Sequence, residues 1–380
     1  MINLWLVCQN LLPKMRYFSL LILLVGVSLS SIAQDNKVWS YGVNPYYGGV
    51  LKYKPSMKQL EYTNLKGVEI YAAKSADGSK SWHKYYNYPQ WGIAASFVDY
   101  GMPDELGQVA SLTTYLDFTT TKKKHKWRAN IGTGVVYSNT QFDSLTNEEN
   151  KAISSTLSLV LRGTIHREFQ INDNWFFNVN LAFRHYSNGK LNMPNNGMNY
   201  PMVGVGIRYA PHKLEIKNID WPERVIDPKI HYTLRGSISW REVWQEDVKH
   251  KAYSLTFYGS KQVSKYNNIL LGLDAFRYSQ KSIDNANVVY LQTNNLSFDT
   301  QLNRATDQLA ITVGTELLIS KATVVVQGGI YVYRPQVYYA DWYQRYGLKY
   351  NFTNHFFSQV SLRAHGRTAD MMEFGLGVTL

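Results

Sequence analysis

The chain alternates between apolar and polar residues over many short stretches. The clearest example runs from Trp175 to Ser187, where Trp175, Phe177, Val179, Leu181 and Phe183 alternate with a mostly polar set. A period of two is typical of a β-strand with one apolar and one polar face. A ten-residue loop, 189–198, and a second alternating run over 199–209 follow. The pattern therefore predicts a β-hairpin near the middle of the chain.

The same alternation recurs along the whole sequence and predicts about sixteen strands, or fourteen without the weak N-terminal ones. The predicted strands are Tyr46–Tyr53, Thr63–Ala73, Trp91–Tyr100, Val109–Thr120, Trp127–Tyr137, Ser155–Phe169, Trp175–Ser187, Asn199–Tyr209, Tyr232–Trp240, Tyr253–Tyr258, Ile269–Phe276, Leu309–Ile319, Ala322–Tyr333, Tyr343–Tyr350, Phe356–Ala364 and Met372–Leu380. Pro211, Pro222 and Pro228 indicate a linker over 212–229, between a first half (35–211) and a second half (230–380).

These strands favour an all-β fold, a transmembrane antiparallel β-barrel. Nearly every strand has one apolar face, and the other faces are too rich in Asn, Thr, Ser, Gly and Arg to form the dry core of a soluble sandwich or lipocalin-like barrel. A composition with 29 Tyr, 10 Trp and 15 Phe fits this interpretation. Most long connections, 139–152, 189–198 and 281–306, fall on one side, although 74–90 and the linker fall on the other. We favour one wide barrel, with two eight-stranded units as the alternative, because local patterns do not show how a barrel closes.

The first 34 residues have the features of a secretory signal peptide. Lys14 and Arg16 precede the apolar run 18–27, and small residues precede a cleavage site after Ala33 or Gln34. The apolar run is too short to be a comfortable membrane anchor. The only cysteine, Cys8, lies in this leader, so the mature chain has no disulfide. We expect a protein of the outer membrane of a Gram-negative bacterium.

The net charge of the chain gives a weaker indication of its binding partners. The formal charge is +12, and removal of the leader with its two cations leaves the mature chain near +10. A basic chain suits anionic partners such as phosphorylated lipid surfaces. Nucleic-acid binding has no other support.

The central hairpin carries three polar groups on its apolar face. His185 and Ser187 continue the apolar register of their strand, and Asn199 begins the apolar set of the next. Polar groups in lipid-facing positions suggest function. In a catalytic interpretation, Ser187 would be the nucleophile and His185, which is neutral near hydrocarbon, would be its general base. Asn199 would orient the imidazole. The backbone N–H groups of Asn188 and Gly189 would stabilise an oxyanion. The simpler alternative is a set of polar residues at the membrane interface.

The longer sequence segment around His185 and Ser187 is more specific than these two residues alone. His185-Tyr186-Ser187-Asn188-Gly189, then Pro194-Asn195-Asn196-Gly197, then Asn199 resembles the lipid A 3-O-deacylase (PagL) / acyloxyacyl hydrolase family of outer-membrane β-barrels. The resemblance implies hydrolysis of an ester-linked acyl chain of lipid A, with Ser187 and His185 as nucleophile and base, Asn188 and Gly189 at the oxyanion, and no metal or other cofactor. In the family, a glutamate stands at the position of Asn199. An amide orients an imidazole but does not stabilise its charged form by charge, so we expect activity to be lower or lost.

Other candidates are less specific. Lys122–Lys126 is a basic turn on the presumed periplasmic side, and Lys190 lies near the trio, whereas Arg184 and Arg208 are expected to line the lumen. No spacing of Cys and His suggests zinc. The alternative function is a non-catalytic barrel, porin-like or structural, that retains the hairpin.

Overall fold

The computed structural model describes residues 39–52, 57, 63–119, 126–222, 225–242, 248–336, 340–366 and 368–380. These residues contain sixteen strands and two helices, α2 (Ser81–Tyr85) and α3 (Gln280–Thr293). The strands are β1 (Trp39–Gly48), β2 (Leu65–Ser75), β3 (Gln90–Asp99), β4 (Gln108–Thr119), β5 (Lys126–Ser138), β6 (Leu157–Gln170), β7 (Trp175–Ser187), β8 (Met198–Tyr209), β9 (Ile230–Glu242), β10 (Lys249–Gln262), β11 (Asn267–Tyr278), β12 (Asp307–Ile319), β13 (Ala322–Tyr333), β14 (Trp342–Asn351), β15 (Phe356–His365) and β16 (Thr368–Thr379). The expected signal peptide and most of the basic turn lie outside the described residues.

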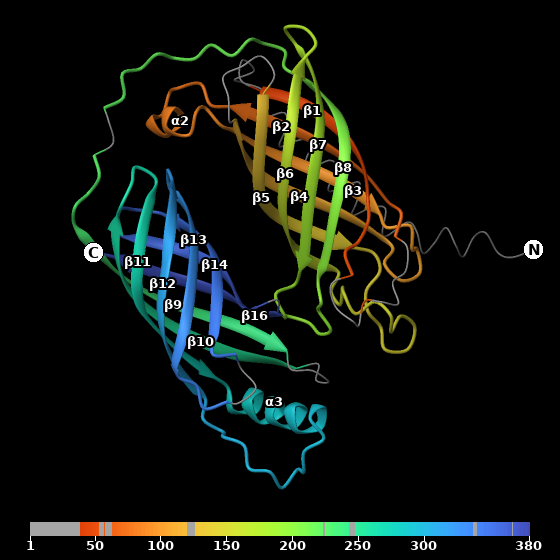
Figure 1. The fold of residues 1–380 in the computed structure, drawn as a ribbon, viewed down its shortest axis with the longest axis vertical. Helices are drawn as coiled ribbons and strands as arrows, with labels where there is room; N and C mark the ends of the chain where they lie inside the picture. The colour runs from red at the N-terminus through yellow and green to blue at the C-terminus, as the bar shows by residue number, and fades with distance from the viewer. Residues whose placement is uncertain are drawn as a thin grey trace, which may run out of the picture.

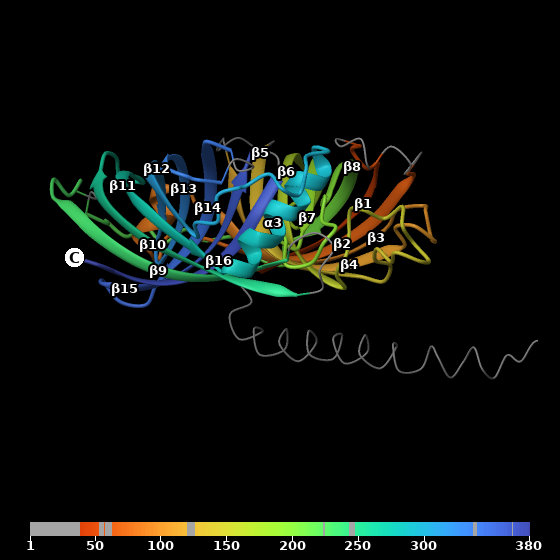
Figure 2. The ribbon, with the colours of Figure 1, turned by 90° about the horizontal axis from the view of Figure 1, so that it is seen from below.

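The strands form two closed antiparallel barrels of eight strands each, which lie side by side (Figures 1 and 2). β8 pairs back onto β1, with Tyr209 opposite Tyr41, and β16 pairs with β9. The all-β barrel prediction is confirmed in its two-unit form, and the preference for one wide barrel was wrong. The physical reason is that each barrel pairs its own edge strands, β8 with β1 on one side of the connection 210–229 and β16 with β9 on the other, so β8 and β9 do not pair.

Both barrels are polar inside and apolar outside. In the first barrel the Glu69 carboxylate accepts hydrogen bonds from Arg162 at 3.1 Å and Arg184 at 3.0 Å. In the second barrel the Arg345 guanidinium lies 2.8 Å from Asp274 and 2.7 Å from Glu373. Outward positions carry exposed aliphatic and aromatic side chains along every wall. This distribution is the one that outer-membrane barrels show, because lipid contacts the outer wall.

One strand and two connections differ from the sequence-based prediction. β1 begins seven residues before the predicted Tyr46, because Pro45 interrupts the alternating pattern without interrupting the pairing of β1 with β2. The connection 281–306 contains α3, whose residues are mostly polar, so it gave no strong helical period. The connection 74–90 contains α2. Among the described residues, no helix is long and apolar enough to cross a membrane.

The barrels also contact each other, and the two ends of the molecule can be named by these contacts. We call the end that carries 210–229 the linker end and the end that carries the loop 188–197 the site end. At the linker end Tyr86 Oη donates to the Leu318 carbonyl at 2.6 Å, and Tyr266 Oη donates to the Tyr85 carbonyl at 2.8 Å. The connection 74–90 is therefore long because it reaches from the first barrel to the second.

Candidate active site

Two adjacent strands, β7 and β8, bring the predicted trio together on the outer wall of the first barrel, and β6 flanks them. His185 on β7 lies directly opposite Asn199 on β8 and Leu161 on β6, and Ser187 lies opposite Leu159. The side chains of Arg184 and Tyr186, on either side of His185 in the sequence, point inward and are buried. Because side chains alternate along a strand, His185 and Ser187 share the outward face with exposed Leu181 and Phe183.

The imidazole of His185 is oriented by Asn199. His185 Nδ1 and Asn199 Oδ1 are 2.7 Å apart. An amide oxygen only accepts hydrogen bonds, so with this amide orientation Nδ1 carries the proton. The other ring nitrogen, Nε2, is then an acceptor, which is the state that a general base needs.

The Ser187 hydroxyl oxygen accepts two hydrogen bonds from the loop that follows β7. The Gly189 N–H donates at 3.1 Å and the Asn195 side-chain amide donates at 2.9 Å. Among the described contacts none joins this hydroxyl to the imidazole. Both side chains border the same space, since a Cβ on Gly197 would lie 3.2 Å from His185 Cε1 and 3.7 Å from Ser187 Cβ. Hydrogen bonds between a nucleophile and its base often form only when substrate binds.

Asn188 makes different contacts from Gly189, and its N–H does not donate to the Ser187 hydroxyl. Its own N–H donates to Asn195 Oδ1 at 3.4 Å, and its side-chain amide donates to the hydroxyls of Ser154 and Ser155 at 3.2 Å each. Asn188 thus ties the loop to the neighbouring connection 139–156. The Gly197 N–H strengthens this link through the Ala152 carbonyl at 3.0 Å.

Sequence reasoning gave no role to Asn195. It lies in a loop, where strand periodicity carries no information, and the only available signal was its place in the Pro194–Gly197 segment. The structure brings its side chain to the Ser187 hydroxyl.

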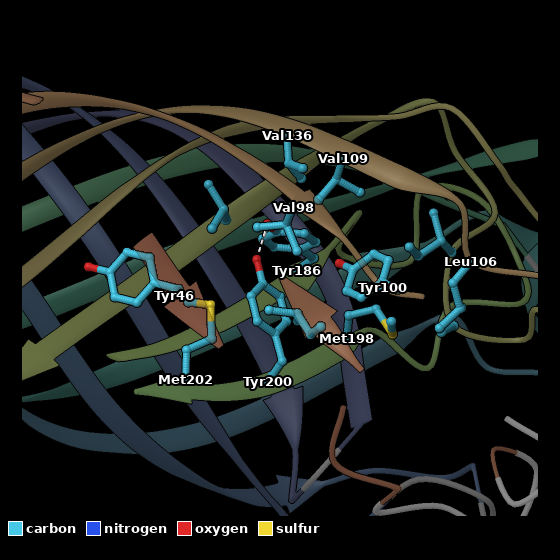
Figure 3. Packing of buried hydrophobic residues seen from close by; sticks show 14 of the residues in the cluster. Tyr46, Val98, Tyr100, Leu106, Val109, Val136, Tyr186, Met198, Tyr200 and Met202 are labelled. Carbon is cyan, nitrogen blue, oxygen red and sulfur yellow. Dashed lines mark hydrogen bonds between the residues drawn. The ribbon is translucent and has the colours of Figure 1, made fainter. Parts of the chain in front are cut away.

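A packed aromatic cluster supports the site from inside the barrel (Figure 3). The rings of Tyr186 and Tyr200 meet edge to face at 5.0 Å, and those of Tyr100 and Tyr200 at 5.8 Å. Burial raises the pKa of the Tyr100 hydroxyl, which lies in the connection after β3, well above its usual value. Tyr186 and Tyr200 directly follow His185 and Asn199 in the sequence, so the cluster fixes the ends of β7 and β8.

The basic residues near the trio separate into two groups. Arg184 and Arg208 point into the lumen, where Arg208 makes two 2.8 Å hydrogen bonds to Glu168, as their predicted lumen-lining role requires. Lys190 stays in the site loop, with a φ of +69°. The described residues contain no cluster of three or more His, Cys, Asp or Glu side chains arranged for a metal ion.

Comparison with known proteins matches each half of the chain to a family model. Residues 66–208 match the family model described as "Lipid A 3-O-deacylase (PagL)", and residues 230–380 match the one described as "Acyloxyacyl hydrolase, C-terminal domain". The chain belongs to the PagL family. The two matches together span most of the chain, one on each barrel. Membership of the PagL family, with the barrel fold, supports a hydrolase of the Gram-negative outer membrane.

Solved structures with similar barrels are only distantly related. The crystal structure of the outer membrane enzyme PagL is 17% identical, with a TM-score of 0.29, and the match covers 43% of this chain and 97% of that chain. Neisserial surface protein A is 7% identical, with a TM-score of 0.32 and coverage of 45% and 96%. The toluene transporter TodX of P. putida is 8% identical, with a TM-score of 0.17 and coverage of 92% and 90%. No curated protein matches the chain.

Proposed function

We propose that the protein is an outer-membrane serine esterase that hydrolyses an ester-linked acyl chain of lipid A. The observation that carries the proposal is the group of contacts on the outer wall: the imidazole held by Asn199, and beside it the Ser187 hydroxyl with two donors from one loop. The outward position gives the hydroxyl access to a lipid without passage through the lumen. Catalysis then needs no metal or other cofactor.

The reaction would begin with proton transfer from Ser187 Oγ to His185 Nε2 as the oxygen attacks the ester carbonyl. Negative charge develops on the carbonyl oxygen, and the Gly189 N–H and the Asn195 amide, which donate to the Ser187 hydroxyl oxygen in the free protein, would turn to that oxygen. Collapse of the intermediate releases the lipid alcohol, which takes the proton from His185. Water then hydrolyses the acyl-enzyme by the same steps.

The surroundings of the trio suit an acyl substrate. Leu159, Leu161 and Phe183 lie next to the trio on the same outer face, and all three are exposed. A fatty acyl chain in contact with them would bury apolar surface, which favours binding by about 25 cal/mol per Å². The sugar and its phosphates would stay at the site end, near Lys190.

The proposal is tested with the full-length protein in detergent and lipid A as substrate. Mass spectrometry should show loss of one acyl chain with the wild type and no loss with Ser187→Ala. Asn195→Ala should lower kcat by roughly 10²-fold to 10³-fold, as removal of one oxyanion donor typically does. Ser96→Ala, which removes a lumen hydroxyl bonded to Ser111, is the matched control and should retain activity. Heat-modifiable migration on gels would verify that each variant is folded, and an intact serine without any deacylation would refute the proposal.

A further inference from the structure

The outer wall of the second barrel carries a buried carboxylate at the site end. Glu242 is the last residue of β9 and follows the outward register of Ile230, Tyr232 and Leu234, which are exposed. Glu242 itself is only 7% exposed. A carboxylate in a lipid-facing register is costly unless it is bonded, so its surroundings are informative.

The surroundings of Glu242 are the site loop of the first barrel. The Glu242 carboxylate accepts a hydrogen bond from the Met193 N–H, and the Glu242 N–H donates to the Lys190 carbonyl at 3.2 Å. One residue of the second barrel therefore binds the backbone of this loop at two points, three and six residues after Ser187.

The second barrel makes another contact with the site loop, between Met372 and Gly189. On β16 the outward residues Phe374 and Leu376 are 42% and 68% exposed, but Met372 in the same register is 5% exposed. A Cβ on Gly189 would lie 2.2 Å from Met372 Cγ, and Gly189 has a φ of +64°, so glycine is required there for both reasons. The methionine is thus seated against the residue whose N–H reaches the Ser187 hydroxyl.

Beside these contacts the loop borders open space. A cavity of about 440 Å³ separates it from α3 and from the β15–β16 hairpin, and Lys190 and Met193 are among its lining residues. From the second barrel, Glu242 and Met372 contact 189–193 directly, and Asp370 and His365 interact electrostatically with Lys190. Without them the loop would have space to move away from Ser187.

We propose that Glu242 and Met372 are positioning residues, through which the second barrel holds the oxyanion donors of the first barrel in place. The proposal rests on the proposed esterase function for its kinetic consequence. The two contacts fix Gly189 and the segment leading to Asn195, and displacement of catalytic groups by about 1 Å costs up to roughly 10²-fold in rate. The second barrel would then be part of the enzyme and not only a structural addition.

The test uses the full chain with Glu242→Ala, Glu242→Gln and Met372→Ala. We expect Glu242→Ala and Met372→Ala to lower kcat by roughly 10-fold to 100-fold with little change in KM, and to speed hydrogen exchange of the amides of 188–193. Glu242→Gln keeps an oxygen acceptor for the Met193 N–H and should recover part of the loss. Leu376→Ala, on the same face of β16, and Tyr86→Phe, at the linker-end contact, are matched controls and should behave as wild type.

The outcomes separate this proposal from the proposed function. If exchange in 188–193 is unchanged in both alanine variants, or rises while kcat stays at the wild-type value, the positioning role is refuted. If the wild type itself does not deacylate lipid A, the esterase proposal fails, and the exchange rates alone decide whether the second barrel holds the loop. Because Met372→Ala removes no charge, it remains informative even if Glu242→Ala does not fold.

Discussion

At the scale of single residues, the proposed mechanism depends on how well Asn199 supports the His185 imidazole as a base. Its oxygen is 2.7 Å from His185 Nδ1, which is sufficient to orient the ring. In the proposed mechanism His185 becomes a cation when it takes the proton of Ser187, and a neutral amide would stabilise that cation less than a carboxylate would. A hydrogen bond to a charged group contributes about 1.5–3 kcal/mol, compared with about 1 kcal/mol for a neutral pair.

We therefore predict that Asn199→Glu raises kcat by roughly 5-fold to 30-fold, the rate equivalent of about 1–2 kcal/mol. Asn199→Ala should lower kcat, because the ring loses its orienting acceptor. Initial rates of lipid A deacylation at one pH, with matched detergent, measure both effects. Equal activity of the alanine variant and the wild type would show that Asn199 does not orient the base.

The sequence could predict part of the site because strand periodicity assigns side chains to faces. His185, Ser187 and Asn199 were placed on the outer face by counting residues, and the structure has them there. Asn195 lies in a loop without a period. Glu242 and Met372 belong to another barrel, far along the chain. Contacts of that kind depend on how two closed units pack, which no local pattern encodes.

At the scale of strands, the inward faces are held together by buried ion pairs. Glu69 on β2 is 2% exposed and lies between Arg162 on β6 and Arg184 on β7. Its removal would leave two guanidinium groups in the lumen without their shared anion. Breaking a buried ion pair by removing one partner typically costs 3–5 kcal/mol.

We predict that Glu69→Ala destabilises the first barrel by about 3–5 kcal/mol. The midpoint of unfolding in denaturant, followed by heat-modifiable migration on gels, should fall accordingly. Glu148→Gln is the matched control, since its carboxylate is 72% exposed and lies 3.7 Å from Lys151, and an exposed pair of this kind contributes less than about 1 kcal/mol. A midpoint for Glu69→Ala equal to that of the control would contradict the prediction.

Elements were predictable to different degrees for a related reason. Every predicted strand overlaps a strand of the structure, because lipid on one side and a polar lumen on the other enforce strict alternation. α3 was not predicted, since Gln280–Thr293 has few apolar residues and only one face of it is buried. The start of β1 was predicted too late in the sequence, because Pro45 carries no N–H and is unusual within a strand.

At the scale of the molecule, closure was the property that the sequence did not contain. β8 would continue into β9 in a wide barrel, but the structure pairs Ile207 of β8 with Val43 of β1. Both halves alternate equally well, so alternation could not distinguish one barrel from two. Closure into units of eight strands also determines what the lumen can hold, because barrel diameter grows with strand number.

The two-barrel arrangement bears directly on the porin-like alternative. Eight strands leave an interior just wide enough for side chains, and here the lumen is occupied by charged networks around Glu69 and, in the second barrel, around Arg345. A cavity in the first lumen, beside Glu69 and Asp117, has a volume of about 20 Å³, which is roughly the space of a single water molecule. Among the described residues, a lumen filled in this way leaves little room for a continuous column of water.

We predict that the purified protein gives no steady conductance steps in planar lipid bilayers, in contrast to a sixteen-stranded porin measured in the same membrane. Glu69→Ala provides an internal comparison, because loss of the ion pair loosens the lumen and should produce at most brief, irregular openings. Steady wild-type channels that persist in Ser187→Ala would favour the porin-like function over the esterase. The absence of channels together with serine-dependent deacylation would instead locate the activity on the outer wall, where the substrate lipid already lies.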